Sequence, residues 1–201
     1  MLTIGVIGCG RIAERHVKAY QHIREVKVVL ADQDTNAAQR LAGSAGQEWC
    51  QSPALLLERS DVDAIDVCVP TLAHAEIALA ALRAQKHVFC EKPLCHTVAE
   101  AREIAAVREA VDRTVMVGYL YRFHPAFEFA KQVLDDGIVG KPHMAIFRLG
   151  GRGGHRAWKH TSESGGGATL EMVVHSLDLI LWLLGPVECV RVHSITTLLP
   201  E

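Results

Sequence analysis

A chain of 201 residues is longer than one ordinary domain and shorter than two. Its 49% hydrophobic and 22% charged residues exclude a disordered chain and fit a globular protein with a real core. The formal net charge of -2 gives no electrostatic reason to expect nucleic acid or an anionic membrane as a partner. No apolar run reaches the roughly 18 residues of a membrane span, and the first residues lack the basic segment of a signal peptide. We therefore expect a cytoplasmic protein.

Short apolar segments alternate with longer amphipathic segments from the first residue, which is typical of βαβ units. Strands are expected at 2–7, 26–31, 64–69, 87–90 and 114–118, with a weaker one near 47–50. Helices are expected at 11–23, 34–44, 53–59, 72–85, 97–111 and 124–136. The pattern predicts an α/β fold whose first domain, residues 1–120, is a doubly wound parallel sheet of the Rossmann type.

The rhythm changes after residues 135–142, and residues 121–201 are expected to form a partial α+β second domain. A strand is expected from His143, followed by a loop at 150–167, a helix to residue 185 and a second strand at 187–199. A two-stranded sheet with one helix leaves open edges. We therefore expect either that this domain pairs with another chain or that the sequence has been cut short.

The first expected strand runs directly into a glycine pattern, in which Gly8, Gly10 and Ala13 match G-x-G-x-x-A. The first glycine permits a tight turn, the second lets a pyrophosphate approach the backbone, and the small third residue lets helix and strand pack closely. Arg11 and Ile12 open the helix, whose N-terminal N–H groups are free to bind phosphates. These five residues are candidates to bind a dinucleotide.

Asp32 ends the second expected strand, about 20 residues after the glycines. A carboxylate in this place can accept hydrogen bonds from both ribose hydroxyls of NAD, although an ordinary turn aspartate is the alternative. No arginine follows directly to bind a 2′-phosphate. The sequence therefore favours NAD over NADP.

The expected helix at 165–185 is apolar except for one polar stripe. At about 100° per residue, Glu171, His175 and Asp178 fall on one side with Trp182. Buried ionisable groups are costly unless they are paired or face a wet cleft. The stripe therefore indicates either a site or a set of satisfied core residues.

The loop at 150–167 gathers hydrogen-bond donors around Trp158: Arg152, His155, Arg156, Lys159 and His160. Such donors suit an acidic sugar, a phosphate or a sugar nucleotide, and a solvated loop is an equal alternative. A zinc site is disfavoured because no short fixed spacing joins the histidines. The six cysteines are scattered without zinc-ligand spacing, so we expect free thiols and no metal.

Three segments carry a resemblance to a known family: "CVPTLAHAEIALAALRAQKHVFCEKP", "VMVGYLYRFHPAFEFAKQVLDDGIVGKP" and "GGGATLEMVVHSLD". In this order they resemble the Gfo/Idh/MocA oxidoreductases, over nearly the whole chain. Members of that family carry a broad second-domain sheet that floors the substrate site and usually forms the oligomer interface. The resemblance thus implies a chain truncated in that domain and a homo-oligomer formed through its sheet.

The resemblance also implies roles for particular residues. Lys92 would contact the substrate hydroxyl, His175 would be the base, and Glu171 would stand where the family usually has an aspartate partner. The remaining implied contacts with the cofactor are Pro70, Thr71, His74, Glu91 and Lys92, and those with substrate are Arg122, Trp158 and Asp178, with a structural role weighed for Asp178.

Hydride transfer from a carbinol carbon to nicotinamide leaves a hydroxyl proton, and a histidine beside a carboxylate is suited to take it. We therefore expect an NAD-dependent oxidoreductase acting on a secondary hydroxyl or ketone of a sugar, cyclitol or sugar derivative. The alternatives are a non-catalytic dinucleotide-binding protein and an NAD-dependent glycoside hydrolase. Glu171 in place of aspartate and Val174 in place of a small residue depart from the family pattern, which leaves the substrate open.

Overall fold

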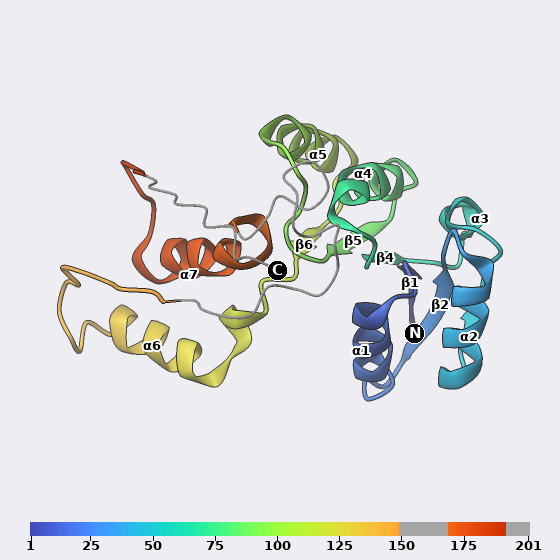
Figure 1. Ribbon diagram of the computed structural model, residues 1–201, viewed down its shortest axis with the longest axis horizontal. Helices are drawn as coiled ribbons and strands as arrows, with labels where there is room; N and C mark the ends of the chain where they lie inside the picture. Colours follow the sequence, from blue (N-terminus) through green and yellow to red (C-terminus); the bar gives the residue numbers. More distant parts are fainter. Residues whose placement is uncertain (149–168, 192–201) are drawn as a thin grey trace, which may run out of the picture. The chain divides into compact units, whose positions relative to one another are not determined.

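The computed structural model describes residues 1–148 and 169–191 (Figure 1). These residues divide into two compact units. Of the described residues, the first unit holds 1–119 and 169–174, and the second holds 120–148 and 175–191.

The first unit is built on a six-stranded sheet in which all the strands are parallel. Its strands are β1 (Leu2–Ile7), β2 (Val26–Ala31), β3 (Glu48–Trp49), β4 (Ala64–Val67), β5 (His87–Cys90) and β6 (Val115–Val117). Their order is β3-β2-β1-β4-β5-β6, so the strand order reverses between β1 and β4. This confirms the predicted Rossmann sheet, including the weak strand near 47–50, which is only two residues long.

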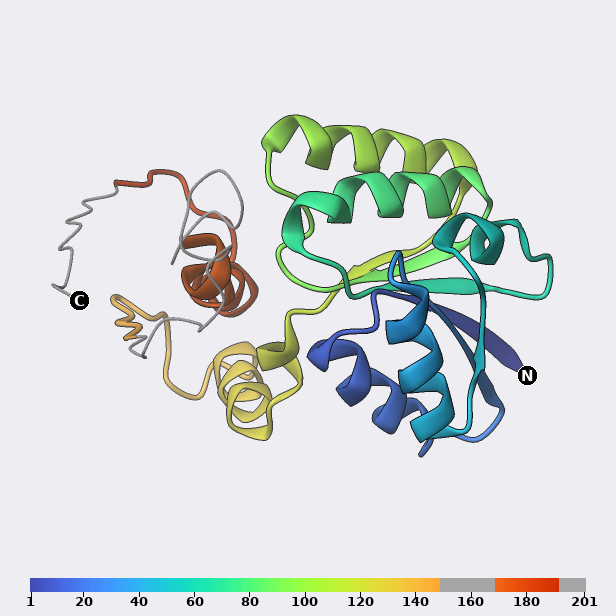
Figure 2. The same cartoon turned by 45° about the vertical axis from the view of Figure 1, so that its right-hand side comes forward.

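Helices cover both faces of the sheet. They are α1 (Arg11–Tyr20), α2 (Thr35–Ala45), α3 (Pro53–Glu58), α4 (His74–Arg83) and α5 (Val98–Val111), with a short 3-10 turn at Thr71–Ala73. Figure 2 shows α1 and α2 side by side on one face, while α4 and α5 lie together on the other. This double covering makes the strands apolar on both sides.

The alternation of side chains along β2 assigns them to two separate cores. Val28 and Leu30 pack with Val17 of α1 and Leu41 of α2, whereas Val29 packs in the core beneath α4. All five are buried, with exposed fractions between 0% and 8%. The strand β2 is therefore buried on both of its faces.

The second unit contains a 3-10 turn at Leu120–Phe123, α6 (Pro125–Asp135) and most of α7 (Val174–Leu184). The helix α7 confirms the predicted apolar helix, and a π-helical turn at Thr169–Val173 precedes it. The predicted strand from His143 is wrong over residues 143–148, and the one at 187–199 is wrong over residues 187–191. Neither of these described stretches is hydrogen-bonded to a neighbouring strand, and an apolar run needs such a partner to form a strand. The rest of each predicted strand lies outside the described residues.

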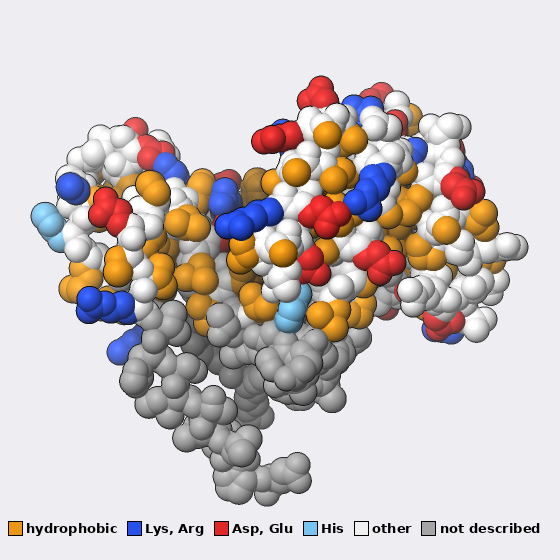
Figure 3. All heavy atoms as spheres, turned by 90° about the horizontal axis from the view of Figure 1, so that it is seen from above, with side chains coloured by type: hydrophobic (Ala, Val, Ile, Leu, Met, Phe, Trp, Pro, Cys, Tyr) orange, Lys and Arg blue, Asp and Glu red, His pale blue; other side chains and the backbone are white. Residues whose placement is uncertain are grey.

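The surface fits the near-neutral composition. On the face seen in Figure 3, acidic and basic side chains are interspersed rather than gathered by sign. In the part of the chain that the structure describes, no helix combines the length and apolarity needed to cross a bilayer.

Candidate functional site

The turn between β1 and α1 requires glycine at its first position. Gly8 has φ +94°, and a Cβ built there would lie 2.7 Å from the carbonyl carbon of Cys68. Only glycine combines that backbone conformation with so close an approach. The turn thus brings the end of β1 against the segment that follows β4.

The start of α1 offers room and donors for an anionic ligand. Gly10 is the N-cap of α1 and has no side chain to cap the N–H groups of the first turn. Among the residues that the structure describes, and apart from the two chain neighbours of Gly10, nothing lies within 4 Å of a Cβ built there, which leaves room for a ligand to approach the main chain. Arg11 and Ile12 are exposed, and Ala13 is fully buried against the sheet. Open space at a helix N-terminus fits a pyrophosphate.

Asp32 ties the end of β2 to the glycine turn. Its Oδ2 accepts a hydrogen bond from the Cys9 N–H at 2.6 Å, and its Oδ1 accepts one from the Asp34 N–H at 2.8 Å. A carboxylate has about four acceptor positions, so two remain for the hydroxyls of a ribose. Burial and the nearby Asp32 charge raise the pKa of the Cys9 thiol to about 12, so this cysteine stays a neutral part of the turn.

The segment after β4 is joined to the segment after β5 by His74. This side chain is 2% exposed, and its Nδ1 and Nε2 lie 2.6 Å from the Pro93 oxygen and 2.9 Å from the Val69 oxygen. A hydrogen bond from the ring to a cofactor would require breaking one of these contacts. Pro70, by contrast, is exposed at the same strand end, and Thr71 is buried.

Glu91, Lys92 and Pro93 follow β5 directly, with a cis peptide bond between Lys92 and Pro93. Glu91 and Lys92 are half-buried. The Glu91 N–H donates to the Val67 oxygen at 3.1 Å, and the Lys92 N–H donates to the Glu91 Oε2 at 3.2 Å. The turn therefore continues from the carboxyl end of β5, at the sheet edge that carries the glycine turn.

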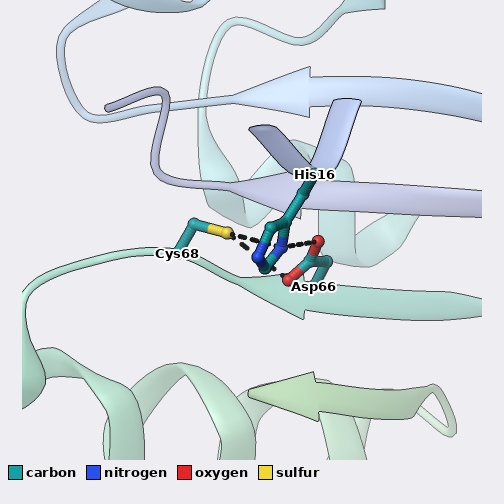
Figure 4. A group of neighbouring side chains, drawn as sticks. All are labelled: His16, Asp66 and Cys68. Carbon is teal, nitrogen blue, oxygen red and sulfur yellow. Dashed lines mark hydrogen bonds and ion pairs between the residues drawn. The ribbon is translucent and has the colours of Figure 1, made fainter. Parts of the chain in front are cut away.

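A polar cluster that the sequence analysis did not predict lies between α1 and the carboxyl ends of β4 and β5. His16 Nδ1 lies 2.8 Å from Asp66 Oδ2, and Cys68 Sγ lies 3.4 Å from the same nitrogen (Figure 4). His16 Nε2 lies 3.2 Å from Glu91 Oε1, and the Tyr20 hydroxyl donates to Asp66 Oδ2 at 2.9 Å. The available signal was Asp66, a charged residue in the middle of an otherwise apolar strand.

The electrostatics of this cluster keep His16 charged. Burial alone would lower the pKa of His16, but its hydrogen bonds to Asp66 and Glu91 raise that pKa to about 9. Burial alone would raise the pKa of the Glu91 carboxyl, but its hydrogen bond from His16 lowers that pKa below its usual range. The result is an imidazolium between two carboxylates.

In the second unit, two residues expected to bind substrate bind each other. The Arg122 guanidinium donates to both carboxylate oxygens of Asp178, from Nε at 2.8 Å to Oδ2. Asp178 is 7% exposed, so this bidentate pair anchors α7 to the 3-10 turn before α6. The ring of His175, one turn earlier on α7, lies 4.8 Å from that of Tyr121, centroid to centroid.

The remaining predicted residues fall outside what the structure describes. Trp158 and the loop donors lie in 149–168, and the side chain of Glu171 is likewise outside the described part. Lys92 belongs to the first unit and His175 to the second, so their convergence stays a prediction.

The parallel sheet, the glycine turn and Asp32 define the first unit as a dinucleotide-binding Rossmann domain. Residues 2–119 match the family model described as "Oxidoreductase family, NAD-binding Rossmann fold". Residues 127–201 match the model of the GFO/IDH/MocA C-terminal domain. The chain therefore belongs to the Gfo/Idh/MocA oxidoreductase family.

Relatives extend along almost the whole chain. An inositol 2-dehydrogenase of Klebsiella pneumoniae subsp. pneumoniae is 34% identical over 189 residues, and a myo-inositol 2-dehydrogenase of Thermotoga maritima is 30% identical over 186. The matches cover 91% and 92% of this chain but 54% and 55% of those proteins. The chain thus spans about half the length of the relatives it matches.

Solved structures agree with this assignment. An NAD-binding oxidoreductase from Klebsiella pneumoniae superposes with a TM-score of 0.79 at 28% identity, covering 92% of this chain and 53% of that one. A levoglucosan dehydrogenase, in complex with NADH and L-sorbose, gives a TM-score of 0.80 at 25% identity, with the same two coverages.

Proposed function

We propose that this protein binds NAD and transfers a hydride between its nicotinamide and a secondary hydroxyl or ketone of a sugar, cyclitol or sugar derivative. One observation carries the proposal: the turn Glu91-Lys92-Pro93 and the glycine turn lie at the carboxyl ends of β5 and β1 in one parallel sheet. In such sheets ligands bind outside these ends, where the strand order reverses. Relatives named as inositol dehydrogenases and a levoglucosan dehydrogenase support the substrate class.

The residues of the first unit fit the cofactor. The open main chain at Gly10 and the N–H groups of α1 would hold the pyrophosphate, and the carboxylate of Asp32 would hold the adenosine ribose. Because that carboxylate would repel a 2′-phosphate, NAD is favoured over NADP. When bound, the nicotinamide supplies the hydride acceptor or donor.

The side chains of this chain would manage the proton and the charge. The Lys92 ammonium would stabilise negative charge on the reacting oxygen, and the His175 imidazole would take the hydroxyl proton. The ring contact with Tyr121 and the neighbouring Arg122–Asp178 pair support this role by holding α7 and the His175 ring in place.

The test is a titration of the purified chain with NADH, followed by oxidation assays. Enhanced NADH fluorescence is expected on binding, and cyclitols, sugars and sugar acids are then screened for reduction of NAD at 340 nm. Reduction with one of these classes supports the proposal. Tight NADH binding without turnover of any of them would instead identify a non-catalytic dinucleotide-binding protein. Release of an aglycone without net NADH would identify a glycoside hydrolase.

A further inference from the structure

His16 lies at the meeting point of three elements of the first unit. It projects from α1 and contacts Asp66 of β4 and Glu91 at the end of β5. The ring is also packed against Phe89, with centroids 5.6 Å apart. His16 therefore links the helix that opens with the glycine turn to the turn that carries Lys92.

The geometry requires protons on both ring nitrogens of His16. Each nitrogen faces a carboxylate oxygen, at 2.8 Å for Asp66 and 3.2 Å for Glu91. A carboxylate only accepts hydrogen bonds, so a neutral ring would leave one of the two contacts without a proton. Asp66 is 0% exposed, and without the proton of His16 its buried charge would keep only the uncharged donors Tyr20 and Cys68, which would be costly.

Two contacts hold the Glu91 carboxylate, one from the His16 ring and one from the main chain. Oε1 meets His16, and Oε2 accepts the N–H of Lys92. A Cβ at Gly118 would lie 3.3 Å from Glu91 Oε1, so this glycine leaves room for the carboxylate. The position of the Lys92 main chain is thus coupled to the charge of His16.

We propose that His16 is a positioning residue, whose imidazolium holds Glu91 and through it the main chain of Lys92, and that loss of its proton releases this turn. The proposal rests on the proposed function for the role of Lys92 in turnover. The coupling itself belongs to the folded chain and is measurable without a substrate.

The groups facing His16 leave it as the one that titrates within the cluster at alkaline pH. Burial and the Asp66 charge raise the pKa values of Tyr20 and Cys68 beyond the usual ranges of a phenol and a thiol. Both keep their protons, and the pKa of the Glu91 carboxyl lies below its usual range. The pKa of His16, about 9, therefore sets the alkaline transition.

The same atoms also suggest a metal site, which the bonding argues against. His16, Asp66 and Cys68 offer three ligand atoms within 4.8 Å of one another. A metal would need the lone pair of Nδ1 and the Cys68 thiolate. Nδ1 instead donates to Asp66, and burial raises the pKa of the thiol.

The test follows His16 and the Lys92 amide by NMR in the full chain. In the wild type, nitrogen-15 signals should show both ring nitrogens protonated at neutral pH, and the ring and the Lys92 amide should titrate together near pH 9. In Glu91→Gln the ring midpoint should fall by about one pH unit or more. In His16→Gln the amide transition should vanish, whereas the exposed control His22→Gln should retain it.

Turnover gives the second readout wherever a substrate is found. His16→Gln should lower kcat roughly tenfold or more while changing the KM for NAD less than about twofold, because a displaced Lys92 affects chemistry rather than cofactor binding. A neutral His16 at pH 7, an amide transition that persists in His16→Gln, or displacement of the ring protons by equimolar zinc would overturn the proposal. Absence of turnover in the wild type would count against the proposed function and leave the NMR result to decide the coupling.

Discussion

At the scale of single residues, the site depends on charged groups whose orientation is fixed by a few hydrogen bonds. Asp32 is held by two N–H donors, His16 lies between two carboxylates, and Asp178 takes both donors of Arg122. These contacts fix the direction of each side chain. The effect of a substitution can therefore be predicted from the hydrogen bonds that it removes.

Removing the Asp32 carboxylate should weaken NADH binding. Asp32→Ala removes two charge-assisted hydrogen bonds to a ribose, so we expect the Kd for NADH to rise by about 10-fold to 100-fold. The preference for NADH over NADPH should shrink, because the repulsion of a 2′-phosphate is also lost. Fluorescence titration measures both, with the exposed Asp61→Ala as control. An unchanged Kd would count against the ribose role.

Lys92 and His175 should affect turnover rather than cofactor affinity. We expect Lys92→Ala and His175→Ala each to lower kcat by about 10²-fold to 10⁴-fold, because each removes a group that acts on the reacting oxygen. The Kd for NADH should change little, as measured by fluorescence beside the exposed control Lys18→Ala. Full turnover by His175→Ala would disprove the assignment of the base.

At the scale of elements, the β1–α1 turn separates a folding requirement from a binding requirement. Gly8 faces the main chain of Cys68 with a positive φ, whereas Gly10, with φ −86°, has no described residue other than its chain neighbours within 4 Å of its Cβ position. The two glycines are thus needed for different reasons, although the sequence pattern treats them alike.

Alanine at the two glycines should give opposite results. Gly8→Ala should lower the free energy of unfolding by roughly 1–3 kcal/mol or more, because its Cβ overlaps the main chain in a strained conformation. Gly10→Ala should leave the stability nearly unchanged and raise the Kd for NADH at least roughly tenfold, because the methyl group occupies the space for the pyrophosphate. Urea unfolding and fluorescence titration measure the two effects. Equal NADH affinity in Gly10→Ala and wild type would contradict the assigned position of the pyrophosphate.

At the scale of the whole molecule, the two units differ in how much they bury. Both apolar core clusters belong to the first unit. On α7, Leu177, Leu181 and Leu184 are between 40% and 50% exposed. The first unit therefore supplies most of the apolar burial among the described residues.

The stability of the folded chain should depend on pH through His16. Its pKa is about 9 when folded and 6.5 in an ordinary environment. The stabilisation is therefore complete below about pH 6.5 and is lost as the pH rises through 9, a change on the order of 3 kcal/mol at most. Glu91 has the opposite sign, because its lowered pKa makes its stabilisation disappear in acid. Urea unfolding between neutral and alkaline pH should show the decline, and His16→Gln should flatten it; a parallel decline in the variant would contradict this assignment.

Local patterns in the sequence were enough to predict the alternation of strands and helices, the glycine turn and the position of Asp32. These features depend on neighbours a few residues apart, as the continuous burial at the end of β2 and the confirmed helix at 174–184 illustrate. The expected strands near 143 and 187 were wrong over their described residues, because a strand also depends on a partner that local spacing does not specify.

The surroundings of the site, by contrast, depend on contacts between segments that are far apart in the chain. His16, Asp66 and Glu91 are separated by 50 and 25 residues, and the parallel order β1-β4-β5 brings them together. The same packing turned His74 toward two carbonyl oxygens, and in the second unit the contact of α7 with the 3-10 turn at Leu120–Phe123 paired Arg122 with Asp178. Residue type and spacing give the chemistry that a side chain can perform, but its partner depends on contacts between distant segments, which form only when those segments pack together.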